Sequence, residues 1–416
     1  MKLLSVMYNG WGEHWPLGTL ADNGHDILFE YSPEALRRGI ELSPRHLPLR
    51  VIAFGGAPRH QHGLPGLIAD SLPDGWGQLL MDRLRGQASV SPLDRLAFIG
   101  EHGMGALSYW PASAREPEPA RVASPAWLAE LANAAQDVGR GEASPLLGQL
   151  ALLGAAPHGT RPKLLLSLPD QADAHGQSHD HGGAEADAHA GSAAPWLIKF
   201  AGHGQHKEVC AIEYVYAELA RACGLEVPDT RYFDLDRNQA AFASRRFDRE
   251  DGQRVPVQTL ASLLHANFRL PSVDYGTFLR ATRLLTRDQR QVEAAFQRCV
   301  FNVLFNHRGD HARSIAYRMN RKGDWQLAPC HGLEFSHGPL GQHQMPVMGA
   351  CAAPARADLL RLAADTAVPE RRARDLIAAT LAQAGLFARL ARDAPIRAGT
   401  VKTIAQAIAA NRDRLK

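Results

Sequence analysis

Residues 1–32 alternate apolar and polar side chains in a way that is typical of β-strands. The segment KLLSVMYNG is short and rich in strand-forming residues, WGEHWPLGTLAD follows it, and DILFEYS resumes the alternation after the turn signal Asn23-Gly24. This pattern predicts a small sheet. A Pro-rich polar stretch at 115–125 predicts a boundary, so we expect residues 1–120 to form a β-rich N-terminal module.

From residue 146 onward the order of the predicted elements becomes informative. An apolar segment ends at the turn 154–163, and the strands LLLSL and WLIKF follow on either side of a polar insertion at 171–195. Apolar residues spaced by three and four positions then predict a helix over 209–223. Two more strand patterns, RYFDLD and QAAFASRRF, precede a half that is mostly helical from about residue 256.

This succession of turn, strand, lysine-bearing strand, helix, strands and helical half is the element order of a protein kinase. It predicts an α+β, bilobal, protein-kinase-like fold, with a kinase N-lobe-like region at 121–255 and an all-helical C-lobe at 256–416. Many other α+β proteins share such an order. The choice among them therefore depends on particular motifs.

Composition narrows the class of protein further. The 416 residues include 46 Lys and Arg against 43 Asp and Glu, and a net charge of +3 argues against a surface built throughout to bind nucleic-acid phosphates. The sequence has no run of 18 apolar residues and turns polar too early for a secretory signal, so we expect a cytoplasmic protein. Its five cysteines form no CxxC pair, which supports neither a disulfide framework nor a zinc ribbon.

Several stretches make the kinase-like interpretation specific. They are LPGLIADSLPDGWGQLLMDRL, LDRLAFIGEHGMGALSYWP, the turn GAAPHGTRPK, WLIKF, IEYVYAELARACGLEVPDTR, RRFDR, FNVLFNHRGDHARS and WQLAPCHGLEFSHGP. Together, from about Val6 to Pro354, they resemble the HipA family of kinase toxins from bacterial toxin–antitoxin pairs. The resemblance implies a HipA-like fold and a cleft for ATP.

The resemblance also implies which residues bind the nucleotide. In the glycine-rich turn, Gly159 lets the backbone approach phosphates, although by itself the segment would be an ordinary strand connection. Lys199 lies in an apolar strand and needs an anionic partner, for which Glu213 on the next helix is the best candidate unless it is merely solvated. At the hinge, Phe247 would hold adenine and Asp248 would reach the ribose. The full set is His158, Gly159, Thr160, Arg161, Lys163, Lys199, Glu213, Arg245, Arg246, Phe247, Asp248 and His331.

The catalytic segment departs from the family pattern. Where the family normally has NRDDHxKN, with a catalytic Asp and a metal-binding Asn, this chain has Gly309 and Ser314. Where a later Asp binds magnesium, it has Gly332. Removing such electrostatic groups commonly costs on the order of 100-fold each. The changes therefore predict weakened or lost phosphotransfer and no protein ligand for Mg²⁺.

Two further positions bear on activity. The serine that active relatives autophosphorylate corresponds to Ala156, so that regulatory switch is absent. Asp310 stands next to the vacant position and is the candidate for a displaced base, although a shift of one residue reorients a side chain. By the resemblance, His311 would order the catalytic loop. The alternative is a buried histidine whose ring nitrogens are hydrogen-bonded and which has no role in the site.

The polar insertion at 171–195 is rich in Ala, Gly, Asp and His and has no apolar period, which predicts a disordered surface loop. Its imidazoles are potential ligands for a transition metal, but a flexible loop lacks the fixed geometry of a metal site. A solvated insertion is the favoured interpretation, and no metal site is predicted. The residues concerned are His175, His179, Asp180, His181 and His189.

Two functions from different classes remain open. The first is a pseudokinase toxin that binds a nucleotide or a partner protein, which the altered positions favour. The alternative is an active ATP-dependent Ser/Thr kinase that phosphorylates a translation component with Asp310 as base. The resemblance implies a HipB-like helix-turn-helix antitoxin as partner, operator DNA through that antitoxin, and no membrane.

Overall fold

The N-terminal residues form the antiparallel sheet that their alternation predicts. The computed structural model describes residues 1–86, 90–113, 122–170 and 193–416. The strand order in this sheet is β4-β3-β2-β1-β5. Its strands are β1 (Lys2–Tyr8), β2 (Trp15–Asp22), β3 (Ile27–Tyr31), β4 (Ala53–Phe54) and β5 (Leu107–Trp110). The accompanying helices are α1 (Pro33–Arg38), the 3-10 turn η1 (Arg59–Gln61), α2 (Gly66–Ala69), α3 (Gly75–Arg85) and α4 (Pro92–Ile99).

A second antiparallel sheet, in the order β6-β7-β9-β8, forms the N-lobe-like region. The helices α3, α5 and α6 supply apolar side chains that pack with one face of this sheet, and α7 packs against β8 and β9. The elements are α5 (Pro125–Arg140), α6 (Leu147–Gly154), β6 (Lys163–Pro169), β7 (Ala193–Phe200), α7 (Glu208–Ala222), β8 (Thr230–Asp234), β9 (Ala240–Arg245), β10 (Arg249–Glu250) and β11 (Gln253–Arg254).

Two predicted boundaries need comment: the end of the polar insertion and the end of the N-terminal module. The last three residues of the predicted disordered insertion, 193–195, belong to β7, because they continue its ladder with Ser167, Leu168 and Pro169 of β6. The rest of the insertion, with its candidate histidines, lies outside the described residues, as does the predicted domain boundary at 120.

The C-terminal half is mainly helical but contains a three-stranded sheet, which the prediction of an all-helical C-lobe missed. These strands have three or four residues each, too few to show a period along the sequence. The elements are β12 (Val257–Thr259), α8 (Leu260–Leu264), α9 (Tyr275–Thr286), α10 (Gln289–Leu304), the 3-10 turn η2 (Ala312–Ser314), β13 (Ala316–Met319), β14 (Trp325–Leu327), the 3-10 turn η3 (Pro339–Gly341), α11 (Arg356–Asp365), α12 (Glu370–Ala382), α13 (Leu386–Arg392) and α14 (Ala398–Leu415).

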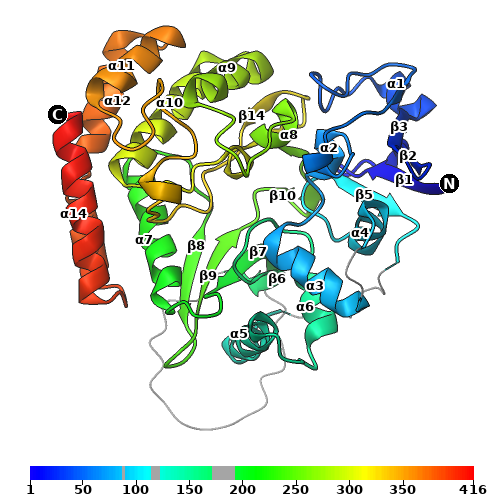
Figure 1. Cartoon of the computed structure of the whole chain (residues 1–416), viewed down its shortest axis with the longest axis horizontal. Helices are drawn as coiled ribbons and strands as arrows, with labels where there is room; N and C mark the ends of the chain where they lie inside the picture. Colours follow the sequence, from blue (N-terminus) through cyan, green and yellow to red (C-terminus); the bar gives the residue numbers. More distant parts are fainter. Residues whose placement is uncertain (87–89, 114–121, 171–192) are drawn as a thin grey trace.

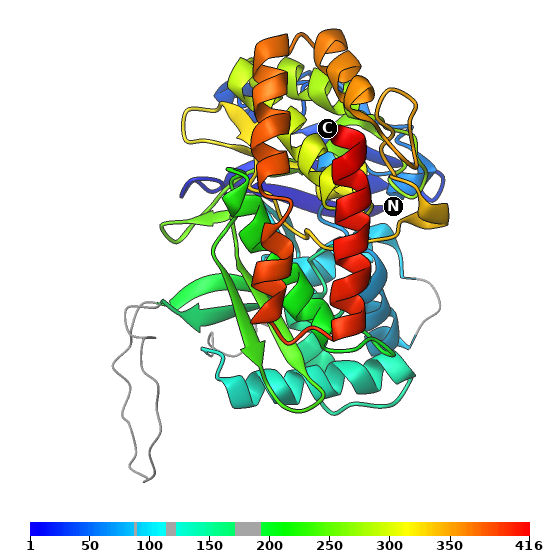
Figure 2. The same cartoon turned by 90° about the vertical axis from the view of Figure 1, so that its left-hand side faces the viewer.

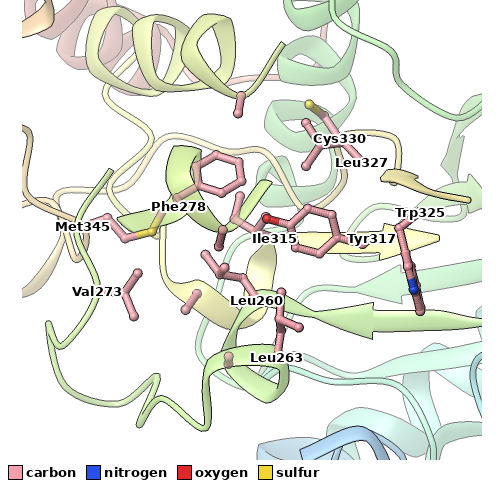
Figure 3. Packing of buried hydrophobic residues seen from close by; sticks show 14 of the residues in the cluster. Leu260, Leu263, Val273, Phe278, Ile315, Tyr317, Trp325, Leu327, Cys330 and Met345 are labelled. Carbon is pink, nitrogen blue, oxygen red and sulfur yellow. The ribbon is translucent and has the colours of Figure 1, made fainter. Parts of the chain in front are cut away.

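The regions share their apolar cores. One cluster runs from the N-terminal sheet through α7 to the C-terminal helices. Figure 3 shows its part around β13, where Phe278, Ile315 and Tyr317 lie close to Leu260 of α8. The second cluster joins α3 of the N-terminal module to the N-lobe-like sheet. The N-terminal module is therefore packed against both lobes.

The pictures show how these parts are arranged. In Figure 1 the N-terminal sheet lies on the opposite side of the molecule from α11, α12 and α14. Figure 2 shows α12, α13 and α14 along one side, with α5 across the end of the N-lobe-like region. Among the helices that the structure describes, none combines the length and apolar character needed to cross a membrane.

Candidate functional site

The segments predicted to carry the chemistry meet at one cleft with a volume of about 400 Å³. Its walls come from strands β6 and β7, the turn 157–161, the end of β9 with the hinge 244–247, and the catalytic loop 307–314. Residues 104–107 of the N-terminal module close one side. Segments far apart along the chain thus meet as the predicted kinase-like order requires.

Lys199 and Glu213 form an ion pair beside this cleft, with Glu213 buried and Lys199 partly buried. Strand β7 and helix α7 follow each other directly, and Lys199 Nζ donates to Glu213 Oε1. Arg161 adds a second cation 3.4 Å from Glu213 Oε2. Burial acts to raise the pKa of Glu213, but the charges of Lys199 and Arg161 outweigh it and the pKa is lowered. Glu213 therefore stays ionised, and the predicted pair is brought together.

Lys163 lies opposite Lys199 in the β6–β7 ladder and has no such partner. Only 3% of Lys163 is exposed, and its Nζ makes no hydrogen bond with any residue that the structure describes. Burial and then the nearby Lys199 charge lower the pKa of Lys163 to about 7. Because an unpaired buried amine is unfavourable, this group gains most from an anion that enters the cleft.

The glycine-bearing turn does not present its backbone freely. The Gly159 N–H donates to Asp74 Oδ1 of the N-terminal module, and the Gly159 carbonyl accepts a hydrogen bond of 3.1 Å from the Trp76 N–H. His158 Nε2 lies 2.7 Å from the Asp70 carbonyl oxygen, and burial lowers the pKa of His158 to about 4, so the neutral ring donates this bond. The prediction that Gly159 faces phosphates directly therefore needs the Asp74 contact to open.

Asp248 does not face the cleft. It is fully buried, with Oδ2 at 2.7 Å from Arg246 Nη2 and 2.8 Å from Arg249 Nη1, and the same oxygen accepts a 2.7 Å bond from the Gly105 N–H. Although burial acts to raise the pKa of Asp248, the two guanidinium groups lower it overall. The prediction that Asp248 reaches a ribose is wrong, because its oxygens hold the hinge to the N-terminal module.

The other hinge residues do line the cleft. Arg245, Arg246 and Phe247 all contribute to its wall, and the ring of Phe247 lies 5.0 Å from that of His331. Burial lowers the pKa of His331 to about 4, so this ring is neutral. The two rings, tilted by 38° to each other, give this part of the cleft an uncharged aromatic surface against which a planar heterocycle can pack.

The positions of the missing acids open onto the same cleft. Gly309, Ser314 and Gly332 line it, and a Cβ built on Gly309 would have His307 Cε1 as its nearest described neighbour, at 3.6 Å. A Cβ on Gly332 would lie 3.6 Å from Lys199 Nζ. The Ser314 hydroxyl donates to the His311 carbonyl oxygen at 2.7 Å. The places for a base and two metal ligands are thus present, but their carboxylate and amide groups are not.

Asp310 does not replace them. It is fully buried, Oδ2 accepts a 2.7 Å bond from the Tyr275 hydroxyl and lies 2.8 Å from His343 Nδ1, and Oδ1 accepts a 2.9 Å bond from the Gln344 N–H. These contacts turn its carboxylate into the C-lobe, which contradicts the expectation of a displaced base. The neighbouring His311 does order the loop, since its Nδ1 accepts the Ser314 N–H at 3.1 Å.

Comparison with known families and structures accounts for this architecture. The HipA N-terminal domain matches residues 4–110, and the HipA-like C-terminal domain matches residues 155–385, more than half of the chain. The chain belongs to the HipA family. This membership confirms the predicted resemblance, and the α+β bilobal fold follows from it.

One solved HipA structure supports the same fold over nearly the whole chain. A HipA of Shewanella oneidensis MR-1, in a complex with HipB and operator DNA, matches with a TM-score of 0.70 at 16% identity, over 99% of this chain and 97% of that chain. The proinflammatory kinase CtkA of Helicobacter pylori matches at 11% identity over 53% of this chain and 85% of that chain, with a TM-score of only 0.39. No protein of curated function matches the chain.

Within this HipA fold, sequence reasoning missed three carboxylates that line the cleft. Asp70 accepts the N–H and hydroxyl of Thr259 at 2.7 and 2.8 Å, Asp74 binds Gly159, and Glu334 pairs with Arg161. Asp70 and Asp74 lie in the ADSLPDGWG stretch that helped to carry the family resemblance, so the motif was visible but its place at the cleft was not.

The donor set does not fit Mg²⁺. All three cleft carboxylates already bind protein donors, and within the described ranges no group of three or more His, Cys, Asp or Glu residues is placed to hold a metal. A hard cation such as Mg²⁺ requires free oxygen ligands. The cleft offers instead the cations Arg161, Lys163, Lys199 and Arg313.

Proposed function

We propose that this HipA-family chain is the toxin-like member of a toxin–antitoxin pair, with a kinase cleft that binds nucleotide phosphates but transfers them weakly or not at all. One contrast carries the proposal. Among the described residues that line the cleft, every carboxylate is bonded, whereas the buried amine of Lys163 is not. The cleft therefore has affinity for an anion but no free acid for chemistry.

The residues present support binding in physical terms. Lys199, fixed by Glu213, and the unpaired Lys163 supply positive charge in a partly buried site, where electrostatic attraction is stronger than in water. The Phe247 and His331 rings offer a wall for the base. These features support the binding of ATP or a similar nucleotide.

Phosphotransfer has no comparable support. A kinase needs a group that accepts the proton of the attacking hydroxyl, and metal ligands that hold the ions which neutralise the phosphate charge. Gly309 offers no proton acceptor, and Ser314 and Gly332 offer at most one hydroxyl, which is already donated to His311. With Asp310 turned into the C-lobe, none of the carboxylates that the structure describes along the catalytic loop takes the place of the base.

A HipB-like helix-turn-helix antitoxin, and operator DNA through it, are the proposed partners. Support comes from the similarity over nearly the whole chain to a HipA that was solved with HipB and operator DNA. With an antitoxin of this kind as partner, a chain that binds nucleotide without transferring phosphate could still act by controlling the antitoxin. Co-purification of the chain with the product of a neighbouring small reading frame tests this part.

The central experiment titrates ATP into the protein by calorimetry with and without Mg²⁺, and then incubates it with γ-labelled ATP. We expect binding whose affinity changes less than about threefold with Mg²⁺, because the described part of the chain offers no group of ligands for the metal. We expect no transfer of label to the chain or to lysate proteins. A magnesium-dependent gain that Ser314→Ala removes, or robust labelling, would establish the active-kinase alternative.

A further inference from the structure

The cleft contains an internal anion at the place where a phosphate would be expected. Asp74 stands at the N-cap position of α3, where an Asp side chain normally accepts an N–H of its own helix. Here it makes no capping bond. One oxygen accepts the Gly159 N–H, and the other lies 3.5 Å from Arg313 Nη1 of the catalytic loop. Asp74 therefore joins the turn above the cleft to the loop below it.

The surrounding backbone is shaped for this contact. Gly75 has φ +41°, and a Cβ there would lie 2.8 Å from Thr160 Cα and 2.9 Å from the Gly159 carbonyl oxygen. A Cβ on Gly77 would lie 2.8 Å from the Ala155 carbonyl oxygen. Only glycine permits so close an approach. The segment 74–77, which we term the clamp, thus fits against the turn 154–160.

The unpaired Lys163 lies on the other side of the same glycine. A Cβ on Gly159 would come within 2.6 Å of Lys163 Nζ, so the amine borders Gly159 although no carboxylate oxygen of the described residues bonds to it. An anion that took the Gly159 N–H would be adjacent to this amine as well. Asp74 accepts the Gly159 N–H but makes no bond with Lys163 Nζ. A larger anion, such as a phosphate group, could accept hydrogen bonds from both donors.

We propose that the clamp is a built-in competitor of the anion site: Asp74 holds the Gly159 N–H and Arg313, and a phosphate-bearing ligand binds by displacing it. The proposal rests on the proposed function and assigns its regulation. Ligand binding and clamp closure compete for the same donors, so each weakens the other by the same factor. A partner that pulls the N-terminal module away from the turn would raise phosphate affinity, and one that presses it down would lower it.

The test compares wild type, Asp74→Asn and Asp70→Asn, with ATP, inorganic tripolyphosphate and adenosine as probes. Both variants remove one negative charge from the cleft, but the Asp70 carboxylate binds Thr259 rather than the turn. We expect Asp74→Asn to raise affinity for ATP and tripolyphosphate about tenfold, within the usual range of coupling between sites. Asp70→Asn should raise it less than threefold, and adenosine affinity should not respond to Asp74→Asn.

Other outcomes are informative in different ways. Equal gains in both variants would reduce the effect to general electrostatics and overturn the proposal. An affinity for ATP that does not change in Asp74→Asn would also overturn the proposal. The proposed function, nucleotide binding in the cleft, would then still stand. Failure of wild type and both variants to bind ATP would remove the proposed function itself.

A second measurement uses the unmodified chain and does not depend on the folding of a variant. Tripolyphosphate should speed amide hydrogen exchange in residues 72–77, because the Trp76 N–H loses its bond to the Gly159 carbonyl when the clamp opens. Exchange in 155–162 should slow. Slower exchange in both segments would mean that the ligand binds with the clamp closed and would overturn the proposal.

Discussion

The two sides of the cleft differ in the charged groups that they present. On the sheet side, the buried Glu213 pairs with Lys199, and Arg161 lies close enough to add a second positive charge. On the catalytic-loop side, glycine and serine stand at the positions of the acids, although the loop itself is fixed by Asp310. Glu213 is buried and Lys199 lines the cleft, so this pair connects the interior of the protein to the site, whereas Gly309, Ser314 and Gly332 line the opposite wall. The fold therefore forms with glycine and serine at the positions of the acids.

The largest effect should follow from breaking the sheet side. Glu213→Ala leaves the partly buried Lys199 next to Lys163 without its carboxylate partner and leaves Arg161 with Glu334 alone, so we expect a loss of about 3–5 kcal/mol in the free energy of unfolding. Urea unfolding followed by circular dichroism measures it. The matched control is Glu218→Ala on the same helix, whose partly exposed pair with Arg221 should contribute less than about 1 kcal/mol. Equal losses would contradict a special role for Glu213.

Restoring the loop side is the converse experiment. Gly309→Asp, Ser314→Asn and Gly332→Asp together replace the base and both metal ligands, and all three positions open onto the cleft. Groups that act as one unit are strongly non-additive, so each single change should do little, while the triple variant should gain on the order of 100-fold in label transfer from ATP. Adding Lys199→Ala should abolish the gain. A triple variant that binds ATP without transferring label would show that more than these acids was lost.

Lys163 also lies on the sheet side, but as a buried amine without a hydrogen-bond partner in the described part of the chain it lowers the free energy of unfolding. We expect Lys163→Met to raise the free energy of unfolding at pH 7 by about 1–3 kcal/mol, the usual penalty of an unsatisfied buried polar group, and to weaken ATP binding. The folded pKa of about 7 lies below the unfolded value of 10.5, so the unfolded chain holds more protons between these pH values. The stability gained from Met should therefore shrink as pH rises toward 10. A gain that does not depend on pH would contradict this assignment.

The smallest effect is on the pH dependence of binding. Above pH 7 the free protein has a mostly neutral Lys163, and an anion must bind together with a proton. Affinity for tripolyphosphate should fall up to about fivefold between pH 7 and 8 in wild type, because the protonated fraction of Lys163 falls by that factor, while Lys163→Met should show a much flatter profile. Calorimetry in two buffers of different ionisation enthalpy would detect the proton uptake directly. Identical profiles would exclude Lys163 as the titrating group.

The features that the sequence predicted well are those with a local signal. The N-terminal strands, the helix α7 and the juxtaposition of Lys199 with Glu213 follow from alternation, from three- and four-residue spacing and from chain adjacency. Asp248 and Asp310 could not be placed in this way. Their orientation is decided by Gly105, 143 positions away, and by His343, 33 positions away. Neighbouring loop residues of the same motif therefore point in different directions for reasons that no local pattern contains.

The clamp was hidden for the same reason. The stretch containing Asp74 helped to indicate the family, but only the folded chain brings it against Gly159, 85 positions later. The short strands β12, β13 and β14 were missed because three or four residues carry no readable period. The site as a whole was predictable as a set of motifs, and its internal connections were not.

The cluster around Asp248 limits how this protein can be recombined with its relatives. Guanidinium groups of Arg246, Arg249 and Arg254 donate to carbonyl oxygens of the loop 101–107 as well as balancing one carboxylate. A chimera that joins this N-terminal module to a foreign kinase body would separate these cations from their acceptors. A stable chimera should therefore carry the N-terminal module together with residues 246–254. We also expect the sequences of these two segments to change together among related proteins.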